Sequence, residues 1–181
     1  MTENTQSSGK QVAFLVAAEG IEQVELTEPW KAVKEVGGMP KLLSPKPGKV
    51  QAFHHLDKAD TFEVDLAVAE ADVASFDALV LPGGVANPDA LRLNKDAVGF
   101  VKSFVESGKP VASICHAAWA LVEAGVLEGR TLTSWPSLQT DVRNAGGTWV
   151  DEEVVVDGNL ITSRKPDDLK AFNAKLLEAL A

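Results

Sequence analysis

Short stretches with the composition of buried strands alternate with helical patterns along this chain, and this alternation constrains the fold most strongly. The strand-like stretches are QVAFLVA (11–17), PKLLSP (40–45), FDALVLPGG (76–84) and PVASI (110–114). Short apolar strands separated by helices are typical of a parallel sheet that is covered on both faces. The sequence therefore predicts an α/β fold, a doubly wound sandwich with a mostly parallel sheet and helices on both faces.

Three segments between these strands have patterns of their own. Residues 19–38 carry apolar side chains at near-helical spacing and end in Gly37-Gly38, which predicts a helix. Pro29 is expected to kink that helix or to set its early turns. Residues 48–65 are less regular and predict extended pieces joined by turns, whereas Asp157-Gly158 marks a hairpin between two late strands.

Composition excludes several classes of protein. The 181 residues suit one domain, which we place at 10–181 behind a polar, disordered tail at 1–9. A formal net charge of −9 without a lysine or arginine cluster argues against nucleic acid as a partner. The chain shows no signal peptide and no apolar stretch long enough for a membrane span, so we expect a cytoplasmic protein that binds no membrane. A single cysteine excludes a disulfide scaffold and a cysteine-rich zinc site, and we expect neither a metal nor another cofactor.

Three loops that follow predicted strands carry unusual chemistry. They are AEGIEQVE (18–25), PGGVANPDA (82–90) and ICHAAW (114–119). The carboxyl ends of parallel strands meet at one edge of a sheet, and sites in doubly wound folds form there. We therefore expect these three loops to converge on one site.

Cys115 lies where a predicted strand turns directly into a predicted helix. Such a turn can hold its central residue in a strained conformation with the side chain at the sheet edge. The free N–H groups of a helix start favour an anion, so we predict a lowered thiol pKa and a nucleophilic, oxidisable thiolate. The alternative for a lone cysteine is a small buried core residue.

Histidines offer one candidate base. His116 follows Cys115 and could remove its proton, or it could instead cap or orient the helix. His54 and His55 fall in the irregular segment, where a solvated turn or an interface is expected rather than a metal site.

Carboxylates and glycines of the other two loops complete the candidate site. Glu22 and Glu25 lie three residues apart, on one face of the predicted helix, and the alternative for Glu22 is a surface carboxylate near the helix start. If Glu25 is buried, its pKa rises, and its protonated carboxyl can donate a hydrogen bond to the cysteine sulfur. Gly83 and Gly84 match no phosphate-loop motif, so we predict that their backbone N–H groups face a developing oxyanion.

With these residues in place, the chain resembles the ThiJ/PfpI superfamily, in its branch of PfpI-like intracellular proteases and general stress proteins. The similarity extends from about Gln11 to the C-terminal helix. It is carried by GIEQVEL, FDALVLPGG, RLNKDAV, GKPVASICH, AGVLEGRTLTSWPS, NAGGTWVDEEVVVDGNLITSR and PDDL. The resemblance implies a flavodoxin-like fold with a nucleophile elbow at Cys115. It also implies a homo-oligomer, with a homodimer as the first candidate and a hexamer as the second.

The resemblance also implies roles for individual residues. Cys115 matches the family nucleophile, His116 its neighbour, Glu25 the carboxyl that bonds the cysteine, and Glu22 a second acid at the site mouth. Asp89 matches an acidic residue that reaches the site of a neighbouring subunit, although this chain has one extra residue between Gly84 and Asp89.

The chain departs from the family after the cysteine–histidine pair. Many members continue with Gly-Pro, whereas Ala117, Ala118 and Trp119 follow here. Ala117 and Trp119 are therefore candidates to line the pocket, although a core position is favoured for Trp119.

The resemblance implies a cysteine-dependent stress-response protein. The resemblance implies an enzyme that acts on reactive carbonyls, as a glyoxalase or deglycase does, or an intracellular cysteine peptidase. Its partners would be small aldehydes or glycated or damaged proteins. The alternative is a non-catalytic oxidative-stress sensor or chaperone that works through oxidation of Cys115. A class I glutamine amidotransferase is disfavoured, because no histidine follows His116.

Overall fold

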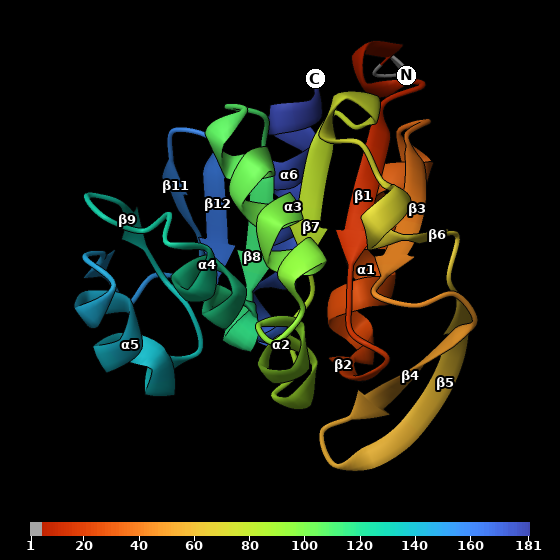
Figure 1. The fold of residues 1–181 in the computed structure, drawn as a ribbon. Helices are drawn as coiled ribbons and strands as arrows, with labels where there is room; N and C mark the ends of the chain where they lie inside the picture. The colour runs from red at the N-terminus through yellow and green to blue at the C-terminus, as the bar shows by residue number, and fades with distance from the viewer. Residues whose placement is uncertain (1–4) are drawn as a thin grey trace.

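The computed structural model describes residues 5–181, and its main sheet has the strand order β11-β12-β8-β7-β1-β3-β6 (Figure 1). All neighbours in it pair in parallel except β11 and β12, which form an antiparallel hairpin. The strands are β1 (Gln11–Leu15), β3 (Met39–Ser44), β6 (Leu66–Ala67), β7 (Ala78–Leu81), β8 (Val111–Ile114), β11 (Val155–Asp157) and β12 (Leu160–Ser163). The central strands β3-β1-β7-β8-β12 follow the 2-1-3-4-5 order of flavodoxin-like folds, which confirms the predicted fold class.

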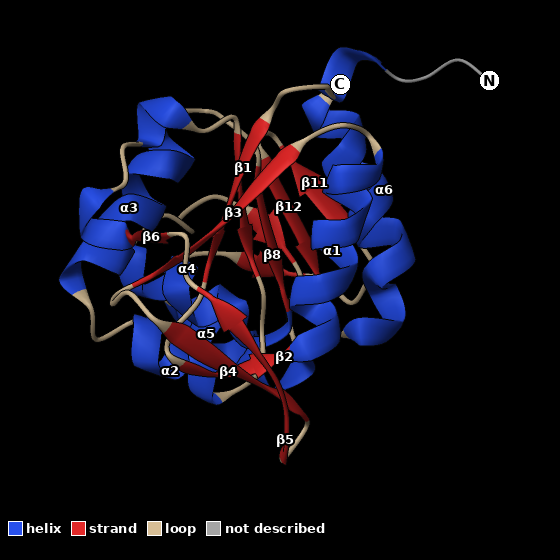
Figure 2. Cartoon of the chain, turned by 90° about the vertical axis from the view of Figure 1, so that its right-hand side faces the viewer, coloured by secondary structure: helices blue, strands red, loops and turns tan. Residues whose placement is uncertain are grey.

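Helices cover both faces of this sheet. The α-helices are α1 (Gln23–Glu35), α2 (Ala86–Leu91), α3 (Lys95–Glu106), α4 (Ala118–Ala124), α5 (Gln139–Asn144) and α6 (Leu169–Leu180). Figure 2 shows α1 and α6 against one face and α3 and α4 against the other. Successive residues of β1 point to opposite faces, so Phe14 packs in the core on the α1–α6 side and Leu15 in the core on the α3–α4 side.

Short 3-10 helices occur at turns between these elements. They are η1 (Thr5–Ser7), η2 (Val68–Glu70), η3 (Val73–Ser75), η4 (Cys115–Ala117), η5 (Pro136–Leu138) and η6 (Pro166–Asp168). Where the sequence predicts a disordered tail over 1–9, the structure has η1 and a fully buried Ser7, and the Gly9 N–H donates to the Gly37 carbonyl. Residues 1–4 lie outside the described part of the chain.

A second, three-stranded sheet lies at the carboxyl end of the main sheet, toward which the arrows of β1, β7 and β8 point (Figure 1). It consists of β2 (Glu19–Glu22), β4 (Lys49–His54) and β5 (Asp57–Glu63), and a two-stranded sheet is formed by β9 (Thr131–Leu132) and β10 (Thr148–Trp149). The extended pieces predicted for residues 48–65 are thus the hairpin β4–β5.

The helix predicted for 19–38 begins later than expected. Residues 19–22 form β2, which pairs in parallel with β4. Within it, Gly20 has a φ of 88° and packs its backbone directly against α2. A Cβ at this position would lie 2.5 Å from the Cβ of Ala86, so only glycine fits. Helix α1 begins at Gln23 and keeps Pro29 in its interior, where the ring nitrogen cannot donate to the Glu25 carbonyl.

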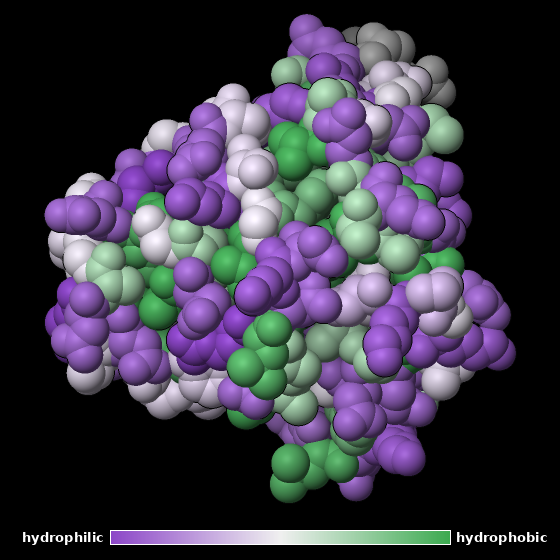
Figure 3. Space-filling view, in the orientation of Figure 1, coloured by the Kyte–Doolittle hydropathy of each residue, from purple (hydrophilic) through white to green (hydrophobic). Residues whose placement is uncertain are grey.

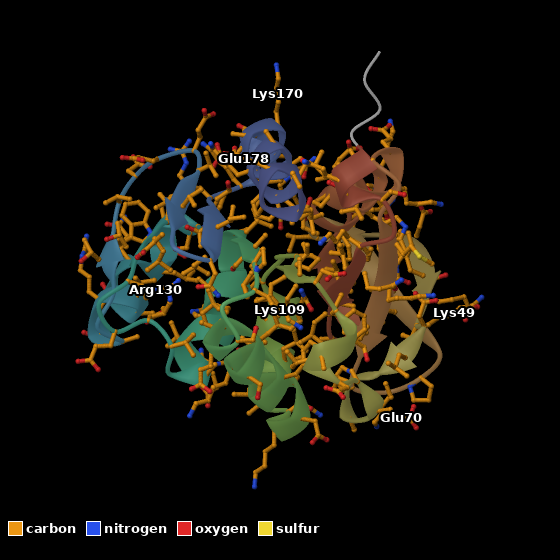
Figure 4. The ribbon with its side chains drawn as sticks, turned by 90° about the horizontal axis from the view of Figure 1, so that it is seen from above. Lys49, Glu70, Lys109, Arg130, Lys170 and Glu178 are labelled. Carbon is orange, nitrogen blue, oxygen red and sulfur yellow. The ribbon has the colours of Figure 1, made fainter. Side chains whose placement is uncertain are left out.

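The surface is mainly hydrophilic on the face that Figure 3 shows, with apolar residues in small patches. One such patch lies at the lower end, where Figure 1 has the turn of the β4–β5 hairpin, and Leu56 in that turn is 94% exposed. Lys49 and Lys170 point away from the protein body (Figure 4). Within residues 5–181, no helix combines the length and the hydropathy that a bilayer span requires.

Candidate active site

The site lies at the point where the strand order of the main sheet reverses. From β1 the chain continues to β3 on one side, and the next central strand, β7, pairs with β1 on the other side. The loops after β1 and β7 therefore diverge and leave a crevice, as doubly wound folds do at their ligand sites. The loop after β8 borders the same crevice, so the three predicted loops converge.

Cys115 occupies the turn between β8 and the helical segment η4–α4. Its φ is 62°, a left-handed conformation that residues other than glycine rarely adopt. The side chain is 7% exposed and lines a cavity of about 630 Å³. The strained strand-to-helix turn predicted for this residue is therefore present, although the thiol lies in a pocket rather than on the open surface.

Glu25 is buried beside this thiol in the first turn of α1. Its side chain has no exposed surface, and its Oε1 accepts a hydrogen bond of 3.1 Å from the Gly83 N–H. Burial and, to a lesser extent, the charge of Glu22 raise the pKa of Glu25 from its ordinary 4.5 to about 8. Glu25 therefore keeps its proton at neutral pH, as the sequence predicts for a buried carboxyl.

The second carboxyl oxygen of Glu25 is free to act on a bound molecule. Oε2 is buried and has no hydrogen-bond partner among the described residues, although the Cys115 thiol is close enough to lower the Glu25 pKa. A buried polar atom without a partner is unusual in a folded protein. A proton on Oε2 can be donated to the sulfur or to a substrate oxygen.

The pKa of the Cys115 thiol is raised, so the predicted lowering is wrong for this state of the site. Burial is the main cause and the charge of Glu25 the second, whereas the backbone N–H groups of His116 and Gly84 lower the pKa in part. When Glu25 holds its proton, its contribution to the raised thiol pKa disappears.

His116 is placed to accept the thiol proton. Its Nδ1 lies 3.2 Å from the Cys115 Sγ, and burial lowers its pKa, which favours the neutral imidazole. The ring is held between two tryptophans: it stacks on Trp135 at 5.6 Å and meets the edge of Trp119 at 5.2 Å between ring centroids. The backbone N–H of Trp135 also donates to the Cys115 carbonyl, so Trp135 is hydrogen-bonded to the turn that holds the thiol.

The two glycines after β7 have different roles. A Cβ on Gly83 would lie 2.5 Å from Oε1 of Glu25 and 2.7 Å from the Cys115 Cβ, so only glycine fits between the two reactive groups. The Gly83 N–H bonds Glu25 and is not available for an oxyanion, whereas Gly84 lines the cavity and its N–H acts on Cys115. The buried Asn87 fixes this turn, because its amide donates to the carbonyls of Pro82 and Gly83.

The other predicted residues are distributed between the cavity and its surroundings. Glu22 is the N-cap of α1, lines the cavity, and accepts a hydrogen bond of 3.1 Å from the His55 N–H. Asp89 is exposed on α2 and lies outside the cavity lining, so its reach to a neighbouring subunit stays a prediction. Ala117 and Trp119, predicted to line the pocket, do not line the cavity; Trp119 lies behind His116 and donates to Asp141.

Several residues of the cavity were not predicted. His55 lies in the turn of the β4–β5 hairpin with a φ of 56°, and Phe53 is at the end of β4. Trp135 and Pro166 enter from loops that follow β9 and β12, and Glu19 comes from β2. Trp135 belongs to the stretch LTSWPS, whose own pattern gives no sign that it faces Cys115. Among residues 5–181, no group of three or more His, Cys, Asp or Glu side chains is arranged to hold a metal.

This arrangement can carry out attack of sulfur on a carbonyl carbon. It provides a thiol, a neutral imidazole next to it, and a protonated carboxyl whose second oxygen is unpartnered. These are the base and acid that nucleophilic catalysis at a carbonyl needs.

Comparison with known proteins gives a consistent result. The model of the DJ-1/PfpI family matches residues 10–179. A deglycase of Thermococcus kodakarensis is 46% identical over 92% of this chain and 98% of its own length. General stress protein 18 of Bacillus subtilis is 41% identical over 95% of this chain and 98% of its own length. The crystal structure of DJ-1beta from Drosophila melanogaster has a TM-score of 0.86 at 30% identity and covers 96% of this chain and 91% of that one. The chain therefore belongs to the DJ-1/PfpI family.

Proposed function

We propose that this protein is a cysteine-dependent enzyme that acts on small reactive carbonyl compounds and on the adducts that they form with amines and thiols. The observation that carries this proposal is the meeting of Cys115 with the protonated Glu25 and the neutral His116 at one cavity. The deglycase that is similar to this chain over almost its whole length supports the same class of reaction.

In the proposed reaction, Sγ of Cys115 forms a bond to the carbonyl carbon while the thiol proton moves to Nδ1 of His116. The π electrons of the carbonyl go to its oxygen, which takes the proton of Glu25 or is stabilised by the Gly84 N–H. With a 2-oxoaldehyde, the proton of the hemithioacetal carbon then moves to the next carbon, and the hemithioacetal hydroxyl proton moves to the oxygen of that carbon, which gives the thioester of a 2-hydroxy acid. Water then cleaves the thioester, so that the net reaction is addition of water to give a 2-hydroxy acid.

The size of the cavity supports a small substrate. Its volume of about 630 Å³ lies in the range of pockets for small molecules. The turn of the β4–β5 hairpin and Trp135 form walls of the cavity, so an extended peptide has little room beside Cys115. A peptidase is therefore the less favoured of the two predicted activities.

The proposal is tested by following methylglyoxal loss and 2-hydroxy acid formation with the wild-type protein and with Cys115→Ser at equal folded concentration. We expect turnover with the wild type and none with the variant. Turnover that persists in Cys115→Ser, or no turnover by either protein, would overturn the carbonyl activity. Cleavage of labelled casein in a parallel assay would favour the peptidase instead.

The redox sensor is the second candidate, because the same carboxyl can bond an oxidised Cys115. Mass spectrometry after mild peroxide treatment tests it. If Cys115 stays a thiol while carbonyl turnover is retained, the sensor hypothesis fails.

We also expect self-association, with a homodimer as the first candidate. The exposed apolar side chains of Leu56 and Val85 at the cavity mouth support a contact there between copies of the chain. Sedimentation at several protein concentrations tests this expectation, and a monomer at all concentrations would contradict it.

A further inference from the structure

The charges around the candidate site have one sign. Glu19 and Glu22 line the cavity, and the buried Glu25 beside them keeps its proton at neutral pH and adds no charge. Among the described residues of the lining there is no lysine and no arginine. Within residues 5–181, neither Glu19 nor Glu22 forms an ion pair. The cavity therefore holds negative charge that no partner neutralises.

This charge acts at the reacting atoms. The charge of Glu22 contributes to the raised pKa of Glu25 and, more weakly, to the raised pKa of Cys115. The electric field of this carboxylate therefore extends to the sulfur. The backbone N–H of His55 donates a hydrogen bond of 3.1 Å to Oε2 of Glu22, which keeps the Glu22 carboxylate at the cavity wall. A cleft with low-dielectric walls focuses such a field and concentrates ligands of the opposite sign.

The aromatic walls add a second, independent preference. Trp135 and Phe53 both line the cavity, and Trp135 is 37% exposed. The face of an aromatic ring attracts an ammonium or guanidinium group, and tryptophan does so most strongly. The walls and the carboxylates thus favour the same kind of ligand.

We propose that Glu19 and Glu22, with the aromatic wall of Trp135, select substrates by charge: the site favours carbonyl compounds that carry an ammonium or guanidinium group and disfavours those that carry a carboxylate or phosphate. This selectivity deepens the proposed function, on which it rests. It also has a consequence for turnover, because the 2-hydroxy acid product is an anion and is repelled by the same carboxylates.

Thiol reagents of matched size and different charge test the selectivity without using catalysis. Cys115 is the only thiol of the chain, so each rate belongs to one site. The reagents are the methanethiosulfonates that bear an ethyltrimethylammonium group, an ethylsulfonate group or a neutral hydroxyethyl group. The rate with each charged reagent is first divided by the rate with the neutral reagent, which removes differences in thiol reactivity. This ratio is then divided by the ratio measured with free cysteine, which removes differences between the reagents themselves.

We expect the corrected cation-to-anion ratio to be about tenfold or more at low salt. The ratio should fall toward one when added salt shortens the Debye length from about 30 Å to about 3 Å. Glu19→Gln should lower the ratio at least about threefold, whereas the matched variant Glu106→Gln, an exposed carboxylate on α3 outside the cavity lining, should leave it unchanged.

A corrected ratio near one in the wild type at low salt would overturn the proposal, and so would a ratio that does not respond to salt. An equal effect of Glu19→Gln and Glu106→Gln would overturn the role of Glu19. The proposed function is tested separately by methylglyoxal turnover. A high ratio without turnover would support the charge selectivity of the cavity and would contradict the proposed reaction.

Discussion

Replacing Glu25 by glutamine should stabilise the fold at alkaline pH while it removes the proton that the reaction uses. Glutamine has nearly the shape of a protonated glutamate, can accept from the Gly83 N–H through its oxygen, and never ionises. The wild-type carboxyl, by contrast, must ionise in a site without exposed surface when the pH rises.

The size of the effect follows from the two pKa values of this carboxyl. Below pH 4.5 the group is protonated in the folded and unfolded chains alike, so it leaves stability unchanged. Between pH 4.5 and about 8 only the unfolded chain ionises, so stability falls as the pH rises. At about 1.4 kcal/mol per pH unit, the loss is about 3 kcal/mol at pH 7 and about 5 kcal/mol above pH 8.

Urea unfolding followed by tryptophan fluorescence between pH 5 and pH 9 measures this effect. The free energy of unfolding of Glu25→Gln minus that of the wild type should be small at pH 5 and grow by a few kcal/mol, about 3 to 5, by pH 8.5. Glu28→Gln, an exposed position on the same helix, serves as the matched control and should change stability by less than about 0.5 kcal/mol at every pH. A difference for Glu25→Gln that does not depend on pH would refute the raised pKa.

Substitutions at three further positions test packing, two of them at the site and one at the Arg164–Asp168 ion pair. Gly83→Ala should destabilise the fold by about 1 to 3 kcal/mol in urea unfolding and abolish carbonyl turnover, because its Cβ would collide with Oε1 of Glu25 and with Cys115. Wild-type turnover by this variant would contradict the close approach. Trp135→Ala should lower turnover through loss of the stack on His116, and Trp135→Phe should restore part of it; equal activity of both variants would argue against the stack. Asp168→Asn should reduce the free energy of unfolding by about 1.5 to 3 kcal/mol, because Arg164 donates to both carboxylate oxygens, at 2.9 and 3.0 Å; an unchanged urea midpoint would be the contrary result.

The fold was predictable because its strands are short, apolar and evenly separated by helices. These local patterns are strong enough to give the parallel sheet, and the sheet in turn brings the loops with Glu25, Gly84 and Cys115 to one edge. The start of α1 was not predictable in the same way. The local pattern of residues 19–22 does not separate them from the helix that follows, whereas the structure pairs them with β4, a segment distant in sequence.

The walls of the site depend on contacts between distant segments. His55 and Trp135 come from turns whose own sequences give no sign that they face Cys115. Trp119 is near Cys115 in sequence and was a candidate for the pocket wall, but it lies behind His116 and donates to Asp141. The periodicity of apolar residues shows which side of a single helix or strand is buried. It carries no information on which distant turn packs next to Cys115.

The thiol pKa could not be inferred from the local pattern either. A strand-to-helix turn suggests a helix dipole that favours the thiolate, but the sequence does not show how deeply the residue is buried. Burial and the charge of Glu25 outweigh the N–H groups of His116 and Gly84. The reactivity of Cys115 therefore depends on whether Glu25 holds its proton.

The pH dependence of Cys115 alkylation by iodoacetamide, compared between the wild type and Glu25→Gln, tests this dependence most directly. Below pH 7 the two proteins should react at rates within about threefold, because Glu25 is then protonated and resembles glutamine. Above pH 8 the wild-type rate should level off while the variant reacts about tenfold faster, since an ionised Glu25 raises the thiol pKa. A ratio of the two rates that stays constant from pH 6 to pH 9 would contradict control of Cys115 by the proton on Glu25.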